Sequence, residues 1–155
     1  MAGKIEARLA ELGLALPDAS APVANYIPFT VVGSIVFVSG QVPRRDGAIW
    51  PTGKLGGGVS VETGQEGAKN CFLAMLAHLK TAAGGDLDRV KRVLRMTGYV
   101  ASTPDFNNQP LVINGASDTA VAVFGDAGRH ARSAIGVIAL PGDAAVEVEG
   151  IFELA

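Results

Sequence analysis

The sequence contains one cysteine, two histidines and one tryptophan among its 155 residues. A single cysteine cannot form an intrachain disulfide, and two histidines without a second cysteine provide neither zinc-ligand spacing nor a hydrolytic triad. We therefore expect a protein of a reducing compartment, with no metal site. Cys71 and His78 both fall on an amphipathic segment, and we expect both to be structural, Cys71 as a packed thiol.

The sequence also has no large excess of positive or negative charge and no long run of apolar residues. The formal net charge is -2 and the isoelectric point is near 5.6, so the chain has no general attraction for a phosphate backbone or an anionic membrane. No segment approaches the roughly 20 consecutive apolar residues that cross a bilayer. Charged residues interrupt the first 16 positions, unlike a signal peptide. The sequence predicts a cytoplasmic protein with no membrane partner and disfavours a nucleic-acid partner.

One domain accounts for the whole length. A chain of 155 residues, 48% hydrophobic and 18% charged, buries roughly two thirds of its unfolded surface as a single unit. Helical spacing joins three apolar residues near the N-terminus, namely Ile5, Leu9 and Leu12. We therefore predict a single domain over residues 1–155, in which residues 1–16 form an N-terminal helical extension.

Turn residues divide the next part of the chain into short strands. Residues 29–32 and 35–39 are apolar runs on either side of Gly33-Ser34, which predicts a hairpin. Residues 43–51 are predicted to be irregular. Gly56-Gly57-Gly58 lacks the lysine and hydroxyl residue that follow the glycines of a phosphate loop, so it indicates only a flexible segment.

Two longer segments have helical periodicity. The first has an apolar stripe of Ala68, Phe72, Met75, Leu76 and Leu79. Thr63 starts a capping-box pattern with Ser60 as an alternative cap, and Gly84-Gly85 marks the end. The second segment has Pro110 at its start. Its predicted buried face comprises Ile113, Ala116, Ala120 and Phe124.

Three further strands complete the predicted order. They span residues 93–100, 131–138 and 145–154, and the turn sequence at 140–143 joins the last two. Hairpin and crossover connections are mixed, which favours an α+β fold with a mixed β-sheet and two main helices on one face. The other face would remain partly apolar, so we expect another copy of the chain to cover it.

Arg132 is the most unusual residue of the predicted strands, where apolar or hydroxyl side chains are favoured. Its planar guanidinium suits a carboxylate, so it is either a substrate clamp or part of an ion pair with a glutamate of the last strand. Glu147, Glu149 and Glu153 alternate with apolar residues and share one face of that strand. They form a solvated face, or one of them acts as a general base beside Arg132.

Other residues have two interpretations each. Asn114-Gly115 are poor helix formers inside a helical pattern, which indicates function, close packing or a later helix start. Tyr26 either contacts a ligand or covers the core, and its ring favours the core. Gly40, at the end of a strand, permits a ligand to approach the backbone or marks a bulge. His130, next but one to Arg132, is either a ligand contact or structural.

Two motifs together resemble the RidA/YjgF family, whose members are also known as endoribonuclease L-PSP. The early motif is Val38-Ser39-Gly40-Gln41-Val42-Pro43, with Tyr26 at the corresponding distance before it. The C-terminal signature consists of Ala131-Arg132-Ser133, Leu140-Pro141 and Val146-Glu147-Val148-Glu149. The resemblance covers most of the chain from Tyr26 onward. It implies a chorismate-mutase-like α+β fold and a homotrimer with a cleft between neighbouring subunits.

The resemblance also implies an activity. Family deaminases hydrolyse reactive enamine or imine acids to 2-keto acids and ammonia, and the residues identified here suggest that no cofactor is needed. By this resemblance Arg132 would clamp the carboxylate of a small metabolite and Glu147 would orient the attacking water. The further cleft residues would be Tyr26, Gly40, Asn114 and, through its backbone, Ala134. The resemblance therefore implies a hydrolase.

Departures from the compact deaminases keep other functions open. The N-terminal helix and the segment 43–58 suggest a divergent subgroup, and Ala134 replaces a cysteine that is frequent in the family. A trimer that only binds a carboxylate metabolite is the main alternative. A ribonuclease or translation inhibitor, suggested by family names, is disfavoured by the acidic composition.

Overall fold

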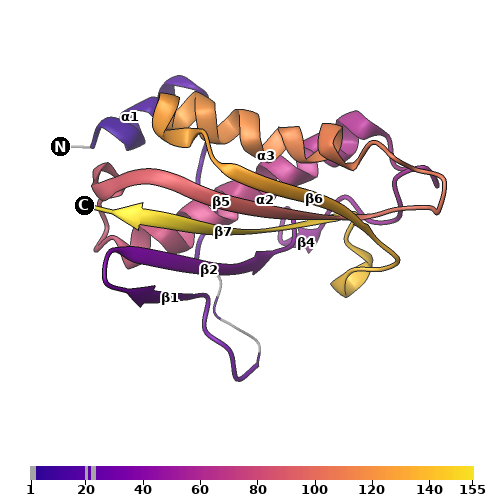
Figure 1. Ribbon diagram of the computed structural model, residues 1–155, viewed down its shortest axis with the longest axis horizontal. Coiled ribbons are helices and arrows are strands. Elements are labelled where there is room, and N and C mark those ends of the chain that lie inside the picture. Colours follow the sequence, from indigo (N-terminus) through magenta and orange to yellow (C-terminus); the bar gives the residue numbers. More distant parts are fainter. Residues whose placement is uncertain (1–2, 20, 22–23) are drawn as a thin grey trace.

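The computed structural model describes residues 3–19, 21 and 24–155. Its main sheet has five strands in the order β1-β2-β7-β5-β6. Neighbouring strands are antiparallel except for the parallel pair β5 and β6 (Figure 1). The strands are β1 Phe29–Val32, β2 Ile35–Gln41, β5 Val90–Ala101, β6 Ala131–Val137 and β7 Val146–Leu154. The predicted α+β fold with a mixed sheet is confirmed.

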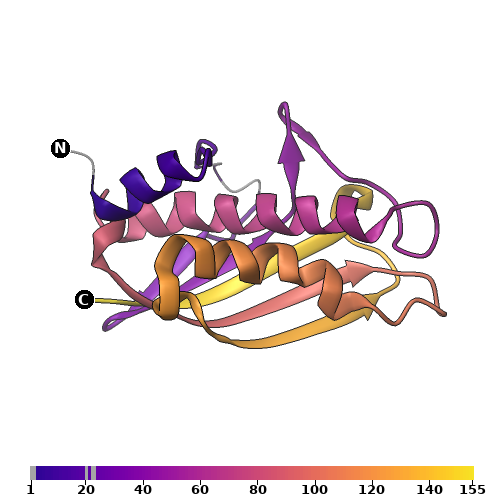
Figure 2. The same ribbon diagram turned by 90° about the horizontal axis from the view of Figure 1, so that it is seen from above.

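Within the described residues, three α-helices lie on one face of this sheet (Figure 2). They are α1 Lys4–Glu11, α2 Val61–Ala82 and α3 Gln109–Phe124, and three short 3-10 helices are η1 Leu87–Arg89, η2 Gly125–Gly128 and η3 Pro141–Asp143. We call the face that α2 and α3 cover the inner face, and the opposite one the outer face. The core between sheet and helices is built on large buried side chains, among them Phe72, Met75, Met96, Ile113 and Phe152. No helix within the described ranges combines the length and apolar character needed to cross a membrane.

The ends of α2 follow local sequence signals. Ser60 is the N-cap, because its Oγ accepts a hydrogen bond from the amide of Thr63 at 3.1 Å. The alternative cap is therefore correct and a start at Thr63 is wrong. The helix stops at Ala82, just before Gly84 and Gly85 take positive φ angles of 74° and 95° that favour glycine.

Helix α3 starts at Gln109, so Asn114 and Gly115 lie inside it and the idea of a later start is wrong. Close packing explains the glycine: a Cβ at Gly115 would overlap the backbone carbonyl of Gln65 in α2. The glycine thus permits α3 to lie directly against α2. The same turn of α3 presents Asn114 towards β6.

A small hairpin replaces the irregular segment that we predicted at residues 43–51. Its strands are β3 Arg44–Arg45 and β4 Ala48–Ile49, and it projects from the helix side of the molecule (Figure 2). Asp46 and Gly47 form the turn with φ angles of 52° and 81°. An Asp-Gly pair is a strong signal for this two-residue turn, and our prediction missed it.

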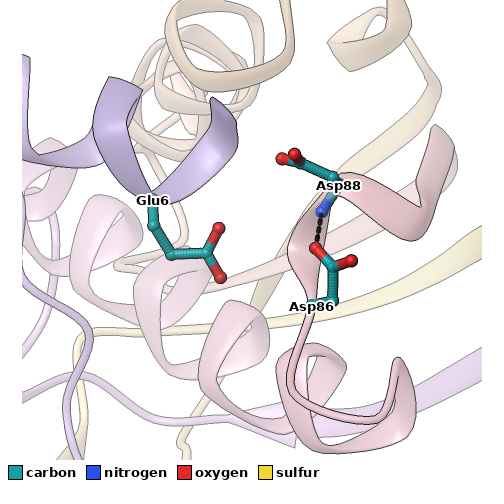
Figure 3. Close-up of side chains that lie close together, drawn as sticks. All are labelled: Glu6, Asp86 and Asp88. Carbon is teal, nitrogen blue, oxygen red and sulfur yellow. Dashed lines mark hydrogen bonds between the residues drawn. The ribbon is translucent and has the colours of Figure 1, made fainter. Parts of the chain in front are cut away.

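Helix α1 attaches to the rest of the domain through carboxylates (Figure 3). Asp88 accepts hydrogen bonds from the first two amides of α1, each at 2.8 Å, and these bonds lower its pKa. Glu6 of α1 reaches Lys80 of α2 at 3.3 Å, while Asp86 accepts from the amide of Asp88. Asp88 and Glu6 therefore help to hold the predicted N-terminal helix in place, while Asp86 caps the η1 turn that carries Asp88.

The outer face is only partly covered, as the sequence led us to expect. Phe37 of β2 and Ile135 of β6 are 43% and 47% exposed, and Phe37 lies opposite Ile151 of β7. Glu147, Glu149 and Glu153 share this face with them, since odd-numbered residues of β7 alternate with its buried ones.

The packing at Gly115 can be tested by substitution. We expect Gly115→Ala to lower the free energy of unfolding by about 1–3 kcal/mol through overpacking against α2, although alanine favours a helix by about 1 kcal/mol over glycine. Urea denaturation measures the change. Asp118→Ala, at an exposed position of the same helix, serves as control and should stay within about 0.5 kcal/mol. A more stable Gly115→Ala variant would contradict this packing.

Candidate functional site

Arg132 points from the sheet towards α3. It lies on β6 opposite Met96 of β5, whose side chain is fully buried on the inner face, so the arginine points to that face too. Its Nη1 donates hydrogen bonds to Oδ1 of Asn114 at 2.8 Å and to Oγ of Ser117 at 3.1 Å. The structure therefore brings together Arg132 and Asn114, which the sequence singled out separately.

The guanidinium keeps one edge free. Both hydrogens of Nη1 are accounted for by Asn114 and Ser117, whereas Nε and Nη2 have no hydrogen-bond partner among the described residues. None of the ion pairs found in those residues includes Arg132. An ion pair with a glutamate of β7 does not form, because β5 separates β6 from β7. The free Nε–Nη2 edge has the geometry that binds a carboxylate through two parallel hydrogen bonds.

His130 completes this group, which we call the Arg132 cluster (Asn114, Ser117, His130 and Arg132). Its Nδ1 lies 2.6 Å from the carbonyl oxygen of Gly128, and its Nε2 lies 3.0 Å from Oγ of Ser117. Burial lowers the pKa of His130. The hydrogen bond to Gly128 acts in the opposite direction, and the positive charge of Arg132 lowers the pKa further. The ring is therefore neutral near neutral pH.

Ser117 was missing from our sequence interpretation. A serine in a helix has no distinguishing pattern of its own. It does stand three residues after Asn114, which places both side chains on one face of α3. That spacing was a usable signal only once Arg132 was known to face the same helix.

Ala134 follows Arg132 on the same face of β6. It is partly buried against the core, and its register partner is Gly98 of β5. Because β6 is at the edge of the sheet, its outer edge has no neighbouring strand within the described residues. The predicted role of the Ala134 backbone requires such an open edge.

Glu147 and Gly40 meet at a different place, on the outer face. Gly40 lies in the irregularity between Val38 and Gln41, where the register of β2 against β7 shifts, so the predicted bulge is present. A Cβ at Gly40 would overlap the carboxylate of Glu147. Burial raises the pKa of Glu147, and the neighbouring Glu149 raises it further.

Tyr26 does not cover the core, so the core role that we inferred from its aromatic ring is wrong. Its side chain is 51% exposed, because the segment before β1 runs along the surface. Tyr26 and Gly40 line a cavity of about 170 Å³ whose wall includes Asn70 and His78 of α2. Gly40 and Glu147, which lie against each other, are called the Glu147 group; Tyr26 shares only this cavity with Gly40.

The Arg132 cluster and the Glu147 group do not meet within one chain. Arg132 is level with Met96 of β5, whereas Glu147 is level with Tyr99, and the two side chains point to opposite faces. From standard strand geometry their Cα atoms are about 10 Å apart across the sheet and about 10 Å apart along it. A single chain therefore presents two separate halves of the predicted site.

The remaining thiol and histidine are buried. Cys71 is fully buried, and burial, followed by the charge of Glu147, raises its pKa well above the usual value. It is the packed thiol that the sequence predicted. Burial also lowers the pKa of His78, which is 3% exposed.

Comparison with known proteins gives the family. The model of the family described as "YjgF/chorismate mutase-like, putative endoribonuclease" matches residues 6–152. Protein TCP17 of Trypanosoma cruzi is 46% identical over 153 residues, which are 98% of this chain and 95% of that protein. The chain therefore belongs to the YjgF/chorismate mutase-like family.

Solved structures agree with this assignment. The protein Atu1372 of Agrobacterium tumefaciens, described as of unknown function, is 46% identical, with 97% of this chain and 93% of that one covered and a TM-score of 0.90. A "putative endoribonuclease" of Shewanella oneidensis MR-1 is 34% identical, with 97% and 99% covered and a TM-score of 0.92. Such coverage means that these structures share the whole architecture of this chain.

The contact between Gly40 and Glu147 predicts a change in titration. Gly40→Ala should push the Glu147 carboxylate towards solvent, so its pKa should fall towards the ordinary glutamate value of about 4.3. Carbon-13 NMR of the side-chain carboxyl carbons, followed against pH, measures this. Glu153, at the other end of β7 and paired with Lys91, is the internal control. An unchanged Glu147 titration would show that the added methyl group does not displace the carboxylate.

Proposed function

We propose that this protein is an enamine/imine deaminase that hydrolyses small 2-imino acids to 2-keto acids and ammonia. The free Nε–Nη2 edge of Arg132 is the observation that carries the proposal. An arginine with an unused edge, held by neutral groups, is suited to bind a carboxylate from outside the chain. A 2-imino acid has its carboxylate directly beside the carbon that reacts, so the clamp also positions that carbon.

The chemistry requires few groups. Water adds to the carbon of the C=N bond and one of its protons passes to nitrogen, which gives a carbinolamine. The hydroxyl group of this adduct then loses its proton, nitrogen takes up a second proton, and the C–N bond breaks to release ammonia and leave a carbonyl group. A carboxylate that accepts the proton of the water and returns it to nitrogen is sufficient. Glu147 suits this role because its raised pKa brings the carboxyl nearer to the operating pH than an ordinary glutamate. No cofactor takes part in these steps.

We propose further that the site lies between subunits of a homotrimer. Glu147 lies on the outer face and Arg132 on the inner one, so only a second copy can place a glutamate beside the clamp. The outer face has exposed apolar side chains and a cavity of about 280 Å³ lined by Phe37, Thr97 and Ile151. Burial of this face against a neighbour would remove that apolar surface from water. Three copies is the number that the family resemblance implies.

The expected ligand is a small carboxylate-bearing metabolite in the cytoplasm. TdcF of Escherichia coli, 24% identical with a TM-score of 0.64, was solved with bound serine, and at this identity it supports the fold alone. Tyr26, Gly40 and Asn114, together with the Ala134 backbone, would line the cleft.

The net charge of -2 gives little support to the ribonuclease function that relatives' names suggest.

A trimer that binds a carboxylate without turnover is the second candidate. It would use the same edge of Arg132, and the separation of Glu147 from that arginine within one chain favours it. Glu147 distinguishes the two candidates, because a binding protein has no need of a proton-transfer group at this position.

Activity can be measured as ammonia release from freshly generated 2-aminoacrylate. We expect Arg132→Ala to lower kcat/KM by about 100-fold or more, since two charge-assisted hydrogen bonds are lost. Glu147→Gln should lower kcat by about 100-fold or more, while pyruvate still binds. Arg129→Ala is the matched control, because Arg129 is exposed and, among the described residues, forms its ion pair with Asp126 alone.

The outcomes separate the candidates. Acceleration by the wild type that disappears in both variants supports the deaminase. Pyruvate binding that depends on Arg132, without acceleration by the wild type, supports the binding trimer. If Arg132→Ala and Arg129→Ala behave alike in both assays, Arg132 is not the clamp.

A further inference from the structure

We infer that His130 is a positioning residue, which acts through Ser117 to hold the guanidinium of Arg132 with its Nε–Nη2 edge towards the ligand. The inference rests on the proposed function only for the ligand class, a carboxylate. It concerns how the clamp is oriented, and it applies whether the site turns over substrate or only binds it.

The hydrogen bonds of the cluster have a fixed direction. The carbonyl oxygen of Gly128 can only accept, so Nδ1 of His130, 2.6 Å away, carries the proton. In the neutral ring Nε2 is then an acceptor, and the hydroxyl of Ser117 donates to it at 3.0 Å. A lone pair of that oxygen remains for Nη1 of Arg132 at 3.1 Å. Each hydrogen atom in this relay thus has one defined acceptor.

The start of the relay is fixed by packing. Gly128 ends η2 and lies directly on α3, where a Cβ would overlap the backbone carbonyl of Ala120. The main chain of η2 therefore cannot move closer to the helix, and the carbonyl that orients His130 has a defined position. Strand β6 begins just after His130, so the same short connection places both His130 and Arg132.

Without His130, the Ser117 hydroxyl would donate its hydrogen bond to a different acceptor. A serine inside a helix commonly donates to the carbonyl four residues earlier, as Thr119 does to Gly115 at 2.7 Å. Such a rotation would turn the oxygen away from Arg132 and leave Asn114 as the sole partner of Nη1. A guanidinium held by one hydrogen bond can rotate and present other edges, which weakens two-point recognition of a carboxylate.

The relay also keeps a second positive charge away from the clamp. His130 has a lowered pKa, caused first by burial and also by Arg132, so the ring is neutral when the arginine is charged. A neutral ring is required for Nε2 to accept from Ser117. Geometry and ionisation thus favour the same tautomer.

A double-mutant cycle tests the relay, with pyruvate as the probe and calorimetry as the measurement. We expect His130→Leu and Ser117→Ala each to weaken pyruvate binding by about 10-fold, and the double variant to bind no more weakly than Ser117→Ala alone. His130→Gln should retain affinity within about threefold, because its amide oxygen can reach the position of Nε2. Asp118→Asn, at the exposed neighbouring position, is the control. Additive effects, or a glutamine variant as weak as the leucine one, would overturn the inference.

NMR provides a test that needs no ligand. Nitrogen-15 spectra of the histidine ring should show His130 as the Nδ1–H tautomer near neutral pH, and a protonated Nε2 would overturn the inference. In His130→Leu the two Nη groups of Arg132 should exchange faster than in the wild type, and unchanged exchange would also overturn it. If pyruvate fails to bind the wild type, the proposed function loses its ligand class while these spectra still decide the relay.

Discussion

The hydrogen bonds from Nη1 of Arg132 to Asn114 and Ser117 tie an edge strand to the helix that covers it. This contact requires α3 to lie close to the sheet and directly on α2, which Gly115 permits. The strand that carries Arg132, β6, has no neighbouring strand on its outer side within the described residues. A partly buried guanidinium is expensive to leave unpaired, and neutral oxygens satisfy only one of its nitrogens. The remaining edge is available for an anion.

The two halves of the site are separated by the topology of the sheet. Insertion of β5 between β6 and β7 places Arg132 and Glu147 two strands apart. The register of both strands against β5 places the two side chains on opposite faces. That arrangement avoids an internal ion pair, which would neutralise the clamp. Under our proposal it also explains why the outer face has both exposed apolar side chains and Glu147, whose pKa is raised. A neighbouring subunit would cover the apolar side chains and place Glu147 beside its own arginine.

Much of this could be predicted from the sequence, because periodicity and turn residues are local signals. The five strands of the main sheet and both main helices followed from such signals, and unusual residue choices within those elements singled out Arg132 and Asn114 as candidates. The position of Ser117 did not, because it depends on which helix face meets β6. The exposure of Tyr26 depends on the path of the segment before β1, which no periodicity specifies. Alternation put Glu147 on one face, but only the register of β6 and β7 against β5 decides that Arg132 lies on the other.

Subunit mixing tests most directly the claim that two copies form one site. Arg132→Ala and Glu147→Gln proteins, each inactive alone, would be unfolded together in equal amounts, refolded and assayed for 2-aminoacrylate hydrolysis. If each site takes its arginine from one subunit and its glutamate from the next, random trimers should regain about a quarter of wild-type activity. Mixed trimers, verified by mass spectrometry, that remain as inactive as the separate variants would contradict a shared site.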